Sequence, residues 1–541
     1  MSADGTATAS TSHATTLTHR AIAEAHKEPN DSAPYSSPTS NHSTARASTG
    51  GTNPARSVFR AISRTLTANM QPEREIGAAP TFMQSIMAVV RHSYLNILCL
   101  FIPVSWILHF VLPENSKNDT IIFVCSFIAI IPLAKLLAFA TDQLSMRVGQ
   151  TLAGLLNATL GNAVELIVSI IALLKCDLQV VQSSLIGSIL SNILLVLGMC
   201  FFAGGVRFSE QGFGVSPVQL NASLLTVSVI AILLPAAFHF LVDPTTTDSI
   251  ENSKILSVSH ASALILLFIY CLYLVFQLRS HKRLYNDEDP GVDAPKTVKY
   301  DPGEKSVGRI TKYLRGSRGG IGAAPADGIF RTATGEPVAP RSESPVDDTN
   351  EATATADIES APHPPHPAVE IPEMNLIVTL GLLVFDTVLV AVTAEFLVDS
   401  INGLVEGGGI SREFVGLILL PIVGNAAEHA TAVAVSVKDK LTLSLGVAVG
   451  SSIQIALFVI PFIVTLSWII GKPLTMLFDP LESLSMFFAV LVVNYTTQDG
   501  KSNWLEGAIL MLLYVILATM FWFYPGVDVS KDLLHFDLTS C

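Results

Sequence analysis

The sequence predicts an all-α integral membrane protein with eleven transmembrane helices, arranged as one leading helix and two inverted five-helix repeats. Three observations lead to this fold class. Half of the 541 residues are hydrophobic and only 14% are charged, about half the charged share of an ordinary soluble protein. Eleven apolar runs are each long enough to cross a bilayer, and one polar motif occurs in both halves of the chain.

A long polar tail precedes the apolar runs. Residues 1–80 are poor in aromatic residues and rich in Ser, Thr, Ala and Pro, so we expect a disordered cytosolic tail. From Tyr94 onward, apolar runs of about 18 residues or more recur, which is the length that a helix needs to cross a ~30 Å hydrocarbon layer. The predicted spans are 94–112, 120–140, 151–174, 184–204, 218–241, 255–278, 375–399, 413–437, 441–470, 474–495 and 505–524.

One hydrophilic insert, 279–373, separates the sixth span from the seventh. Its first part is basic and its stretch 343–373 is acidic, which predicts a regulatory loop, although a plain solvated spacer fits equally well. The predicted units are the tail (1–80), the leading helix with the first repeat (81–278), the loop (279–373), the second repeat (374–525) and a C-terminal tail (526–541).

The placement of Lys and Arg predicts the orientation. The residues before the first span hold 8 basic residues and the insert holds 12, which favours a cytosolic location for both. The short loops do not distinguish the two faces, because each face holds five basic residues in them.

The internal repeat is the strongest signal. Residues 161–165 read Gly-Asn-Ala-Val-Glu and residues 424–428 read Gly-Asn-Ala-Ala-Glu, a separation of 424 − 161 = 263. A Gly-Ser pair at 187–188 recurs at 450–451, again 450 − 187 = 263 residues later. Five spans per repeat force the second copy to enter the membrane from the opposite side. This architecture places a substrate site near the bilayer midplane, built from discontinuous helices of both halves.

The repeated residues are suited to binding a cation. Asn162 with Glu165, and Asn425 with Glu428, are three residues apart and share a helix face. The preceding glycines are places where a helix can loosen and present carbonyl oxygens. A hard cation such as Ca²⁺ prefers such oxygen ligands, and we expect the two glutamates to be its charged ligands. The remaining predicted cation- or proton-binding residues are Gly161, Gly424, Ser188, Ser191, Asn192, Ser451, Ser452 and Gln454.

Two acids within membrane spans indicate function. An ionised carboxylate in hydrocarbon costs several kcal/mol unless it is paired, hydrated or protonated. Burial and mutual repulsion favour the protonated forms of Glu165 and Glu428. If both lose their protons together, they neutralise one Ca²⁺, which provides a chemical route to antiport. The alternative is that these polar residues only hold helices together.

Five further residues are candidates for an access path or a proton path. The acids Asp142, Glu395 and Asp399 lie at span ends, where plain interfacial residues are equally common. Asp386 lies deeper in the seventh span, which favours a functional or pairing role. His429 could relay protons beside Glu428 or bond between helices.

These motifs resemble the two repeat signatures of the calcium/proton exchanger (CAX) family. The stretches that carry the resemblance are 156–173 with 187–192, and 424–429 with 450–455, within a likeness that covers about 94–278 and 374–524. The resemblance implies the cation/Ca²⁺ exchanger fold and exchange of cytosolic Ca²⁺ for lumenal H⁺ across a vacuolar or other acidic endomembrane. It also implies that the cation lies between Glu165 and Glu428. Where relatives tend to carry Glu in the second span, this chain has Asp142.

Other functions stay open. A Mn²⁺/H⁺ or monovalent cation/H⁺ exchanger on the same fold is the nearest alternative. An intramembrane hydrolase with two acids and a membrane scaffold are more distant ones. We expect a transporter and no enzyme, with no cofactor and with Ca²⁺, H⁺ and the lipid bilayer as partners. Cytosolic regulators of the 279–373 loop are further candidate partners, whereas nucleic acid is not expected, because no basic stripe interleaves with aromatic residues.

Overall fold

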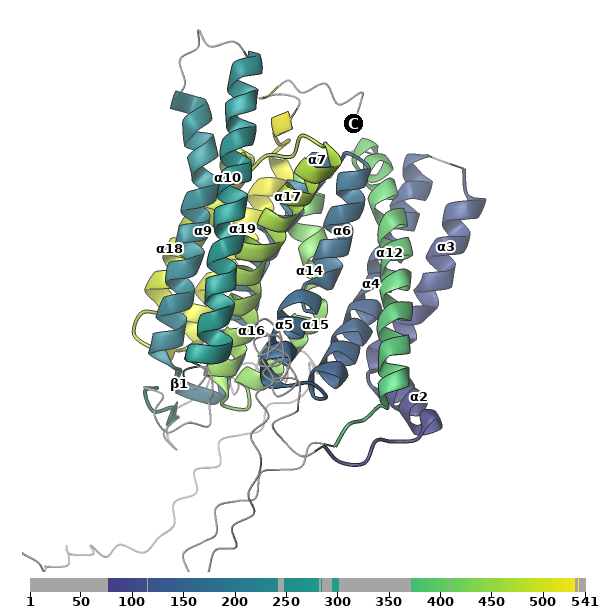
Figure 1. The fold of residues 1–541 in the computed structure, drawn as a ribbon, viewed down its shortest axis with the longest axis vertical. Helices are drawn as coiled ribbons and strands as arrows, with labels where there is room; N and C mark the ends of the chain where they lie inside the picture. Colours follow the sequence, from purple (N-terminus) through teal and green to yellow (C-terminus); the bar gives the residue numbers. More distant parts are fainter. Residues whose placement is uncertain are drawn as a thin grey trace, which may run out of the picture. The chain divides into compact units, whose positions relative to one another are not determined.

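A computed structural model describes residues 76–113, 115–241, 248–281, 284, 294–300, 371–407, 409–530 and 534. All of them belong to one compact unit, Ala61–Cys541, which is almost entirely helical (Figure 1). The predicted N-terminal tail up to residue 75 and the loop residues 301–370, including most of the acidic segment, lie outside the described residues.

The first half of the chain contains most of the helices that surround the site. Its elements are α2 (Phe82–Arg91), η1 (Tyr94–Leu100), α3 (Phe101–Val111), α4 (Ser116–Ser145), α5 (Gln150–Leu160), α6 (Ala163–Leu174), α7 (Leu178–Leu190), η2 (Ser191–Val196), α8 (Leu197–Arg207), β1 (Phe208–Gly212), α9 (Val215–Leu241), α10 (Asp248–Val275), η3 (Phe276–Ser280) and β2 (Val298–Lys299).

The second half repeats this order from α4 onward. Its elements are α12 (Leu376–Glu406), α13 (Arg412–Phe414), η5 (Val415–Leu419), α14 (Leu420–Gly424), α15 (Ala426–Ser436), α16 (Leu441–Gln454), η6 (Ile455–Val459), α17 (Ile460–Ile470), α18 (Pro480–Thr496), β3 (Lys501–Ser502) and α19 (Trp504–Phe523).

Fewer long helices form than the eleven predicted spans. Within the described ranges, eight helices are long and apolar enough to cross a membrane, or nine if the bent pair Arg412–Gly424 and Ala426–Ser436 is one span. The third predicted span is split into α5 and α6, and the tenth is reduced to the 17 residues of α18. In the tenth, Asp479 caps the helix and Pro480 begins it, so residues 474–479 stay outside. Eleven crossings therefore stay a prediction.

Helix boundaries in the two halves match at the predicted separation. Counting from the first residue of each helix, α16 follows α7 by 441 − 178 = 263 residues and α17 follows α8 by 460 − 197 = 263. α15 follows α6 by 426 − 163 = 263. Both α7–α8 and α16–α17 contain a π-helical segment at their middle, η2 and η6. The sequence repeat is thus a repeat of structure.

α4 and α12, the first helices of the two repeats, run antiparallel. The start of α4 meets the end of α12, where Asp119 lies against Gly403. The end of α4 meets the start of α12, where the Gln143 Oε1 accepts hydrogen bonds from the backbone N–H of Glu373 (2.9 Å) and Met374 (3.2 Å). Equivalent helices of opposite direction are what an inverted repeat requires.

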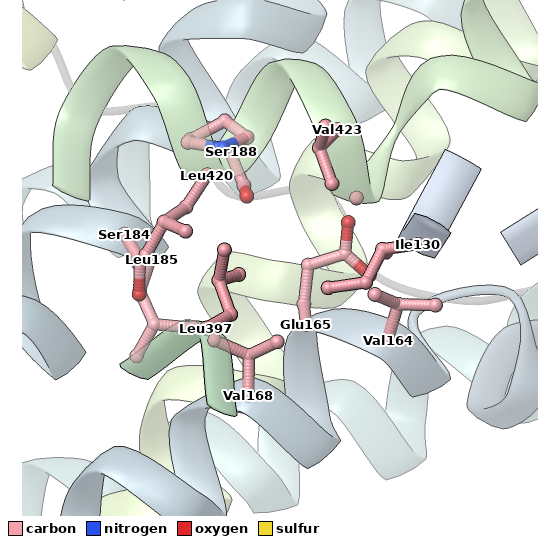
Figure 2. Close-up of a pocket in the computed structure, with 12 residues that line it drawn as sticks. Ile130, Val164, Glu165, Val168, Ser184, Leu185, Ser188, Leu397, Leu420 and Val423 are labelled. Atoms are coloured by element: carbon pink, nitrogen blue, oxygen red, sulfur yellow. The ribbon is translucent and has the colours of Figure 1, made fainter. Parts of the chain in front are cut away.

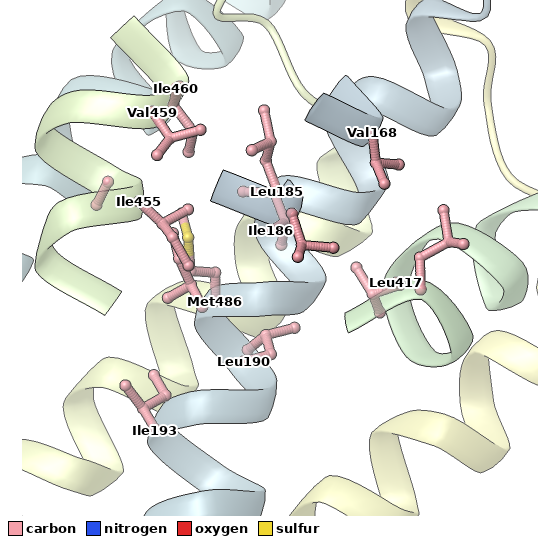
Figure 3. Packing of buried hydrophobic residues seen from close by; sticks show 14 of the residues in the cluster. Val168, Leu185, Ile186, Leu190, Ile193, Leu417, Ile455, Val459, Ile460 and Met486 are labelled. Atoms are coloured by element: carbon pink, nitrogen blue, oxygen red, sulfur yellow. The ribbon is translucent and has the colours of Figure 1, made fainter. Parts of the chain in front are cut away.

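The core lies between the two halves. Figure 3 shows Leu185 and Ile186 of α7 with Leu417 of η5 on one side and Ile455 of η6 on the other. The backbones approach closely because Gly187 packs directly on the backbone of Leu417, where a Cβ would collide. Small residues at helix contacts are typical of membrane proteins, in which dispersion contacts hold the helices together.

A small sheet and a surface helix lie at the end of the bundle where the 279–373 insert begins and returns (Figure 1). We call this end the insert face, and the other end the opposite face. The strand order is β2-β1-β3, so residues 298–299 of the insert pair with the segment that follows α8. α2 exposes Phe82, Met83 and Val90 on one side, and its buried Ser85 accepts a hydrogen bond from the backbone N–H of Asn375 (2.9 Å).

Candidate functional site

The candidate site lies at two breaks in the helices. Asn162 (φ −101°, ψ 27°) stands between α5 and α6, and Asn425 (φ −91°, ψ 3°) stands between α14 and α15, where the chain bends by 58°. Neither residue has helical ψ, so each break creates a fresh helix N-terminus within the bundle. Glu165 and Glu428 lie in the first turns of these new helices. A helix N-terminus favours negative charge, which suits both positions.

The side chain of each glutamate lies against the other half of the protein. The Glu165 carboxylate lies against Gly424 of the second repeat, where an added Cβ would be 2.9 Å from Oε1. The Glu428 carboxylate lies against Gly161 of the first repeat, at 3.8 Å from the equivalent point. Gly424 leaves room for the Glu165 carboxylate, whereas the distance at Gly161 is an ordinary van der Waals contact. The predicted glutamates and glycines therefore form one cluster.

Asn162 connects the two repeats by hydrogen bonds. Its Nδ2 donates to Gln454 Oε1 at 2.6 Å, and its Oδ1 accepts from the Ser451 hydroxyl at 2.8 Å. All three were predicted from the sequence as oxygen ligands. The bonds leave these groups fixed next to the carboxylates.

The equivalent set around Asn425 is less complete. Asn425 is buried and its Nδ2 has no hydrogen-bond partner, and both polar atoms of buried Asn192 also lack one. Ser191 reaches His429 at 3.5 Å across the halves. Ser452 bonds only to Ala448 of its own helix. The two repeats therefore hold related residues in different arrangements.

Glu165 lines a small space. A cavity of about 20 Å³ lies beside it, lined also by Ser184, Ser188 and Gly424. The rest of the lining is apolar, and Figure 2 shows the Glu165 side chain entering from α6 with Leu397 and Leu420 nearby. The space holds about one water molecule and no hydrated ion.

Glu428 lines a much larger cavity. Its volume is about 640 Å³, and Glu428 shares it with Asp142, Asn157, Ser451 and other polar residues. Lys440, Thr442 and Pro217 also line it, and these residues lie in or beside the first turns of α16 and α9, on the insert face. The large cavity thus leads from Glu428 toward the insert face, whereas only a small space lies beside Glu165.

The residues predicted to line an access or proton path lie in different parts of the structure. Asp142 lines the large cavity. Glu395 and Asp399 are instead ion-paired with Lys175 on the opposite face, the former at 3.7 Å. Asp386 is buried at 1% exposure, away from both cavities, with neither carboxylate oxygen bonded.

Sequence reasoning missed two polar residues at the large cavity. Lys135, in the middle of α4, places its Nζ 3.5 Å from Thr431, which lines the cavity. A lone basic residue in an apolar run is the signal that could have identified it. Asn157 accepts a hydrogen bond from Ser145 at 2.6 Å and joins α5 to α4.

Two carboxylates, those of Glu165 and Glu428, lie at the centre. Among the described residues, no group of three or more His, Cys, Asp or Glu side chains is placed to hold a metal ion. A cation beside these two carboxylates would therefore complete its coordination with neutral oxygens, as a hard cation accepts.

Two inverted halves that meet at paired, buried carboxylates, with a cavity open to one face, define a secondary carrier for cations. The comparisons agree, because the profile of the sodium/calcium exchanger protein family matches residues 118–279 and 378–523. The chain belongs to this family.

Individual relatives are similar over most of the chain. A vacuolar calcium ion transporter of Cryptococcus neoformans var. grubii is 51% identical over 489 residues, covering 87% of this chain and 80% of the relative. A Ca²⁺/H⁺ antiporter of Synechocystis is 37% identical over 429 residues, covering 79% and 97%. The crystal structure of the Ca²⁺/H⁺ antiporter protein YfkE is 27% identical, with a TM-score of 0.55, covering 80% of this chain and 100% of that one. The cation/Ca²⁺ exchanger fold expected from the sequence is confirmed.

Proposed function

We propose that this protein is a secondary active antiporter that exchanges cytosolic Ca²⁺ for lumenal H⁺ across the vacuolar membrane. The observation that carries the proposal is the crossed pair of glutamates, each lying against the glycine of the other repeat. The names of the 51% and 37% identical relatives supply the ions and the membrane. The protein is then a carrier and no enzyme, and it needs no cofactor.

The exchange follows from charge balance. Two ionised carboxylates neutralise one Ca²⁺, and two protons neutralise the same pair when Ca²⁺ has left. A site with neither would hold two uncompensated charges in a low-dielectric region, which costs several kcal/mol. Ca²⁺ and protons therefore compete for one site. While that site is ionised and empty, the protein does not readily switch from one open face to the other. Movement of Ca²⁺ in one direction is therefore coupled to movement of protons in the other.

Neutral oxygens complete the proposed Ca²⁺ site. Ca²⁺ takes about six to eight oxygen ligands at about 2.3–2.6 Å. Two glutamates supply up to four of them, and the Asn162 and Ser451 side chains lie next to them. The Asn425 side chain is also buried, and its Nδ2 has no hydrogen-bond partner.

Alternating access is part of the proposal. The large cavity opens on the insert face, which the placement of basic residues assigns to the cytosol. An exchange of conformations between the inverted repeats would close this cavity and open an equivalent one on the opposite face. The state described here would then receive cytosolic Ca²⁺.

Ion flux into vesicles tests the function. We would measure ⁴⁵Ca²⁺ uptake driven by an acidic lumen, with Mn²⁺ and Na⁺ as competitors. Uptake that collapses with the pH gradient supports Ca²⁺/H⁺ exchange. Transport of Mn²⁺ or Na⁺ without Ca²⁺ would point to the other exchangers on this fold. No ion flux from correctly inserted protein would favour a scaffold.

A further inference from the structure

Three carboxylates are buried together on the face opposite the large cavity. Glu413 of α13 is 1% exposed, Asp479 at the start of α18 is 3% exposed, and Glu482 in the first turn of α18 is 1% exposed. The charges of all three interact with one another. We call this group the opposite-face acids.

The Asp479 carboxylate accepts four hydrogen bonds. Its Oδ1 accepts from the backbone N–H of Leu481 (2.8 Å) and Glu482 (3.2 Å). Its Oδ2 accepts from the Tyr524 hydroxyl (2.8 Å) and the backbone N–H of Val527 (3.1 Å). Both oxygens of this buried acid are therefore satisfied.

Glu413 and Glu482 are not satisfied in this way. Glu413 is hydrogen-bonded to the Gln179 side chain through Oε1, while its Oε2 has no partner. Glu482 Oε1 and the neighbouring Ser483 hydroxyl are buried without partners as well. A buried carboxylate whose oxygens lack donors cannot remain charged without a compensating ligand.

Among the residues that the structure describes, little positive charge lies beside this group. The base that acts on Glu413 is Arg412, whose guanidinium is already paired with Asp177 at 3.1 Å and also bonded to Asn402. The other facing groups are Gln179 on α7 and Tyr524 and Asp528 after α19, none of which is cationic. The described acids are not placed to hold a metal ion in this state. Burial favours the neutral form of these two adjacent carboxyl groups, and the ligand that makes a carboxylate neutral is the proton.

The repeat relates this group to the open cavity. Glu482 is the third residue of α18, and the third residue of its counterpart α9 is Pro217, which lines the cavity mouth. Gln179 is the second residue of α7, and the second residue of its counterpart α16 is Thr442, which also lines the mouth. The opposite-face acids thus occupy the place where an equivalent mouth would open on the other side.

The chain after α19 covers the group. Tyr524 and Val527 bond to Asp479, and Gly526, at φ +80°, lies so close to Glu413 that a Cβ would collide with its carboxylate. The acids are sealed in this state, and release of this segment would expose them.

We propose that Glu413 and Glu482 form a proton-binding site that loads protons from the compartment on the opposite face. This inference rests on the proposed exchange of Ca²⁺ for protons. Protons held here are delivered next to the route to Glu165 when that face opens.

Lumenal pH is the variable that tests the site. We would compare full-length wild type with Glu413→Gln, Glu482→Gln and the double variant, measuring Ca²⁺ uptake at fixed outer pH and varied lumenal pH. We expect the double variant to need about tenfold more lumenal protons for half-maximal uptake, a shift of one pH unit. Half-maximal outer Ca²⁺ should stay within about twofold, because the site on the insert face is unchanged. Glu406→Gln, an exposed acid on the same face, is the matched control.

A second measurement does not depend on transport. Infrared absorption of the purified protein at neutral pH should contain protonated carboxyl bands that weaken in the double variant and persist in Glu406→Gln. An unchanged spectrum overturns the proposal, and so does a weakened band with an unchanged lumenal pH profile, because the acids would then be neutral for packing alone. Loss of Ca²⁺ exchange in the wild type would instead refute the proposed function, and the infrared result would still decide whether protons bind here.

Discussion

Among single residues, Asn162 and the glycine–glutamate contacts hold the two repeats together at the site. The side chain of Asn162 bonds across the repeats, whereas Gly424 acts through the absence of a side chain. Both effects depend on the same fact, that the two halves meet within a few ångströms of the carboxylates. We expect substitutions at these residues to weaken ion binding while the protein still inserts into the membrane.

Asn162→Ala should weaken the apparent affinity for Ca²⁺. The change removes two hydrogen bonds and leaves Gln454 and Ser451 without their partner, a loss of about 1–3 kcal/mol or roughly 5- to 150-fold. The measurement is the Ca²⁺ concentration that gives half-maximal uptake. Thr465→Ala is the control, since this hydroxyl bonds to Pro461 of its own helix and lies in no predicted site. Equal effects of both variants would refute the role given to Asn162.

Gly424→Ala should abolish exchange while the protein still inserts. The new Cβ would stand 2.9 Å from Glu165 Oε1 and would displace the carboxylate from the pair. Gly381→Ala, in α12, has no heavy atom within 4 Å of the new methyl and should leave uptake unchanged. Wild-type uptake by Gly424→Ala would show that the close approach is not required.

At the scale of elements, the helix breaks and the surface helix α2 matter most. α2 ends at Arg91, and the ring of the capping residue His92 stacks on Phe139 of α4 with 3.8 Å between centroids. Burial lowers the pKa of His92, nearby Lys135 lowers it further, and Glu373 opposes them. The folded state therefore prefers neutral His92. That preference is complete above the unfolded pKa of about 6.5 and is lost as the pH falls through the folded pKa.

Acidification should loosen α2 from α4. We expect hydrogen exchange of the α2 amides, corrected for its intrinsic pH dependence, to accelerate at pH values below about 6.5. His92→Phe keeps an aromatic ring over Phe139 and cannot be protonated, so it should remove this acceleration. If the variant and the wild type respond alike, another group controls α2.

The repeat was the part of these elements that the sequence could predict. The matched Gly-Asn-Ala-x-Glu motifs located both helix breaks and both glutamates because a duplicated polar motif stands out in apolar sequence. The span count was harder to predict, since hydropathy does not register a break such as Gly161 or a capped start such as Asp479. Glu413 and Glu482 were overlooked, because single acids at helix starts resemble ordinary interfacial residues.

At the scale of the whole molecule, the asymmetry between the faces is the central feature. The two repeats share helix boundaries, yet Glu428 lines about 640 Å³ while Glu165 lines about 20 Å³. Related halves in different conformations are what alternating access needs, because exchange of those conformations moves the opening to the other face. The insert strand β2 pairs beside the open mouth, where Thr297 bonds to Asp439 at 3.0 Å.

Thiol labelling should reveal this asymmetry. Thr431→Cys in the large cavity should react with a membrane-impermeant reagent added to the insert face, and Ca²⁺ should slow the reaction. Ser483→Cys, buried at 1% exposure, should resist labelling from the opposite face unless a gradient drives turnover. Wild-type protein corrects for native cysteines such as Cys271. Labelling of Ser483→Cys at rest would contradict a closed opposite face.

The most direct measurement replaces the central pair. Vesicles with Glu165→Gln, Glu428→Gln or both would be compared with wild type and Glu406→Gln for ⁴⁵Ca²⁺ uptake driven by an acidic lumen, with insertion checked in each. Each glutamine retains the shape of the side chain and removes the charge that balances Ca²⁺. We therefore predict that all three variants lose uptake and that Glu406→Gln keeps the uptake of wild type. Undiminished Ca²⁺ uptake by the double variant would contradict the account.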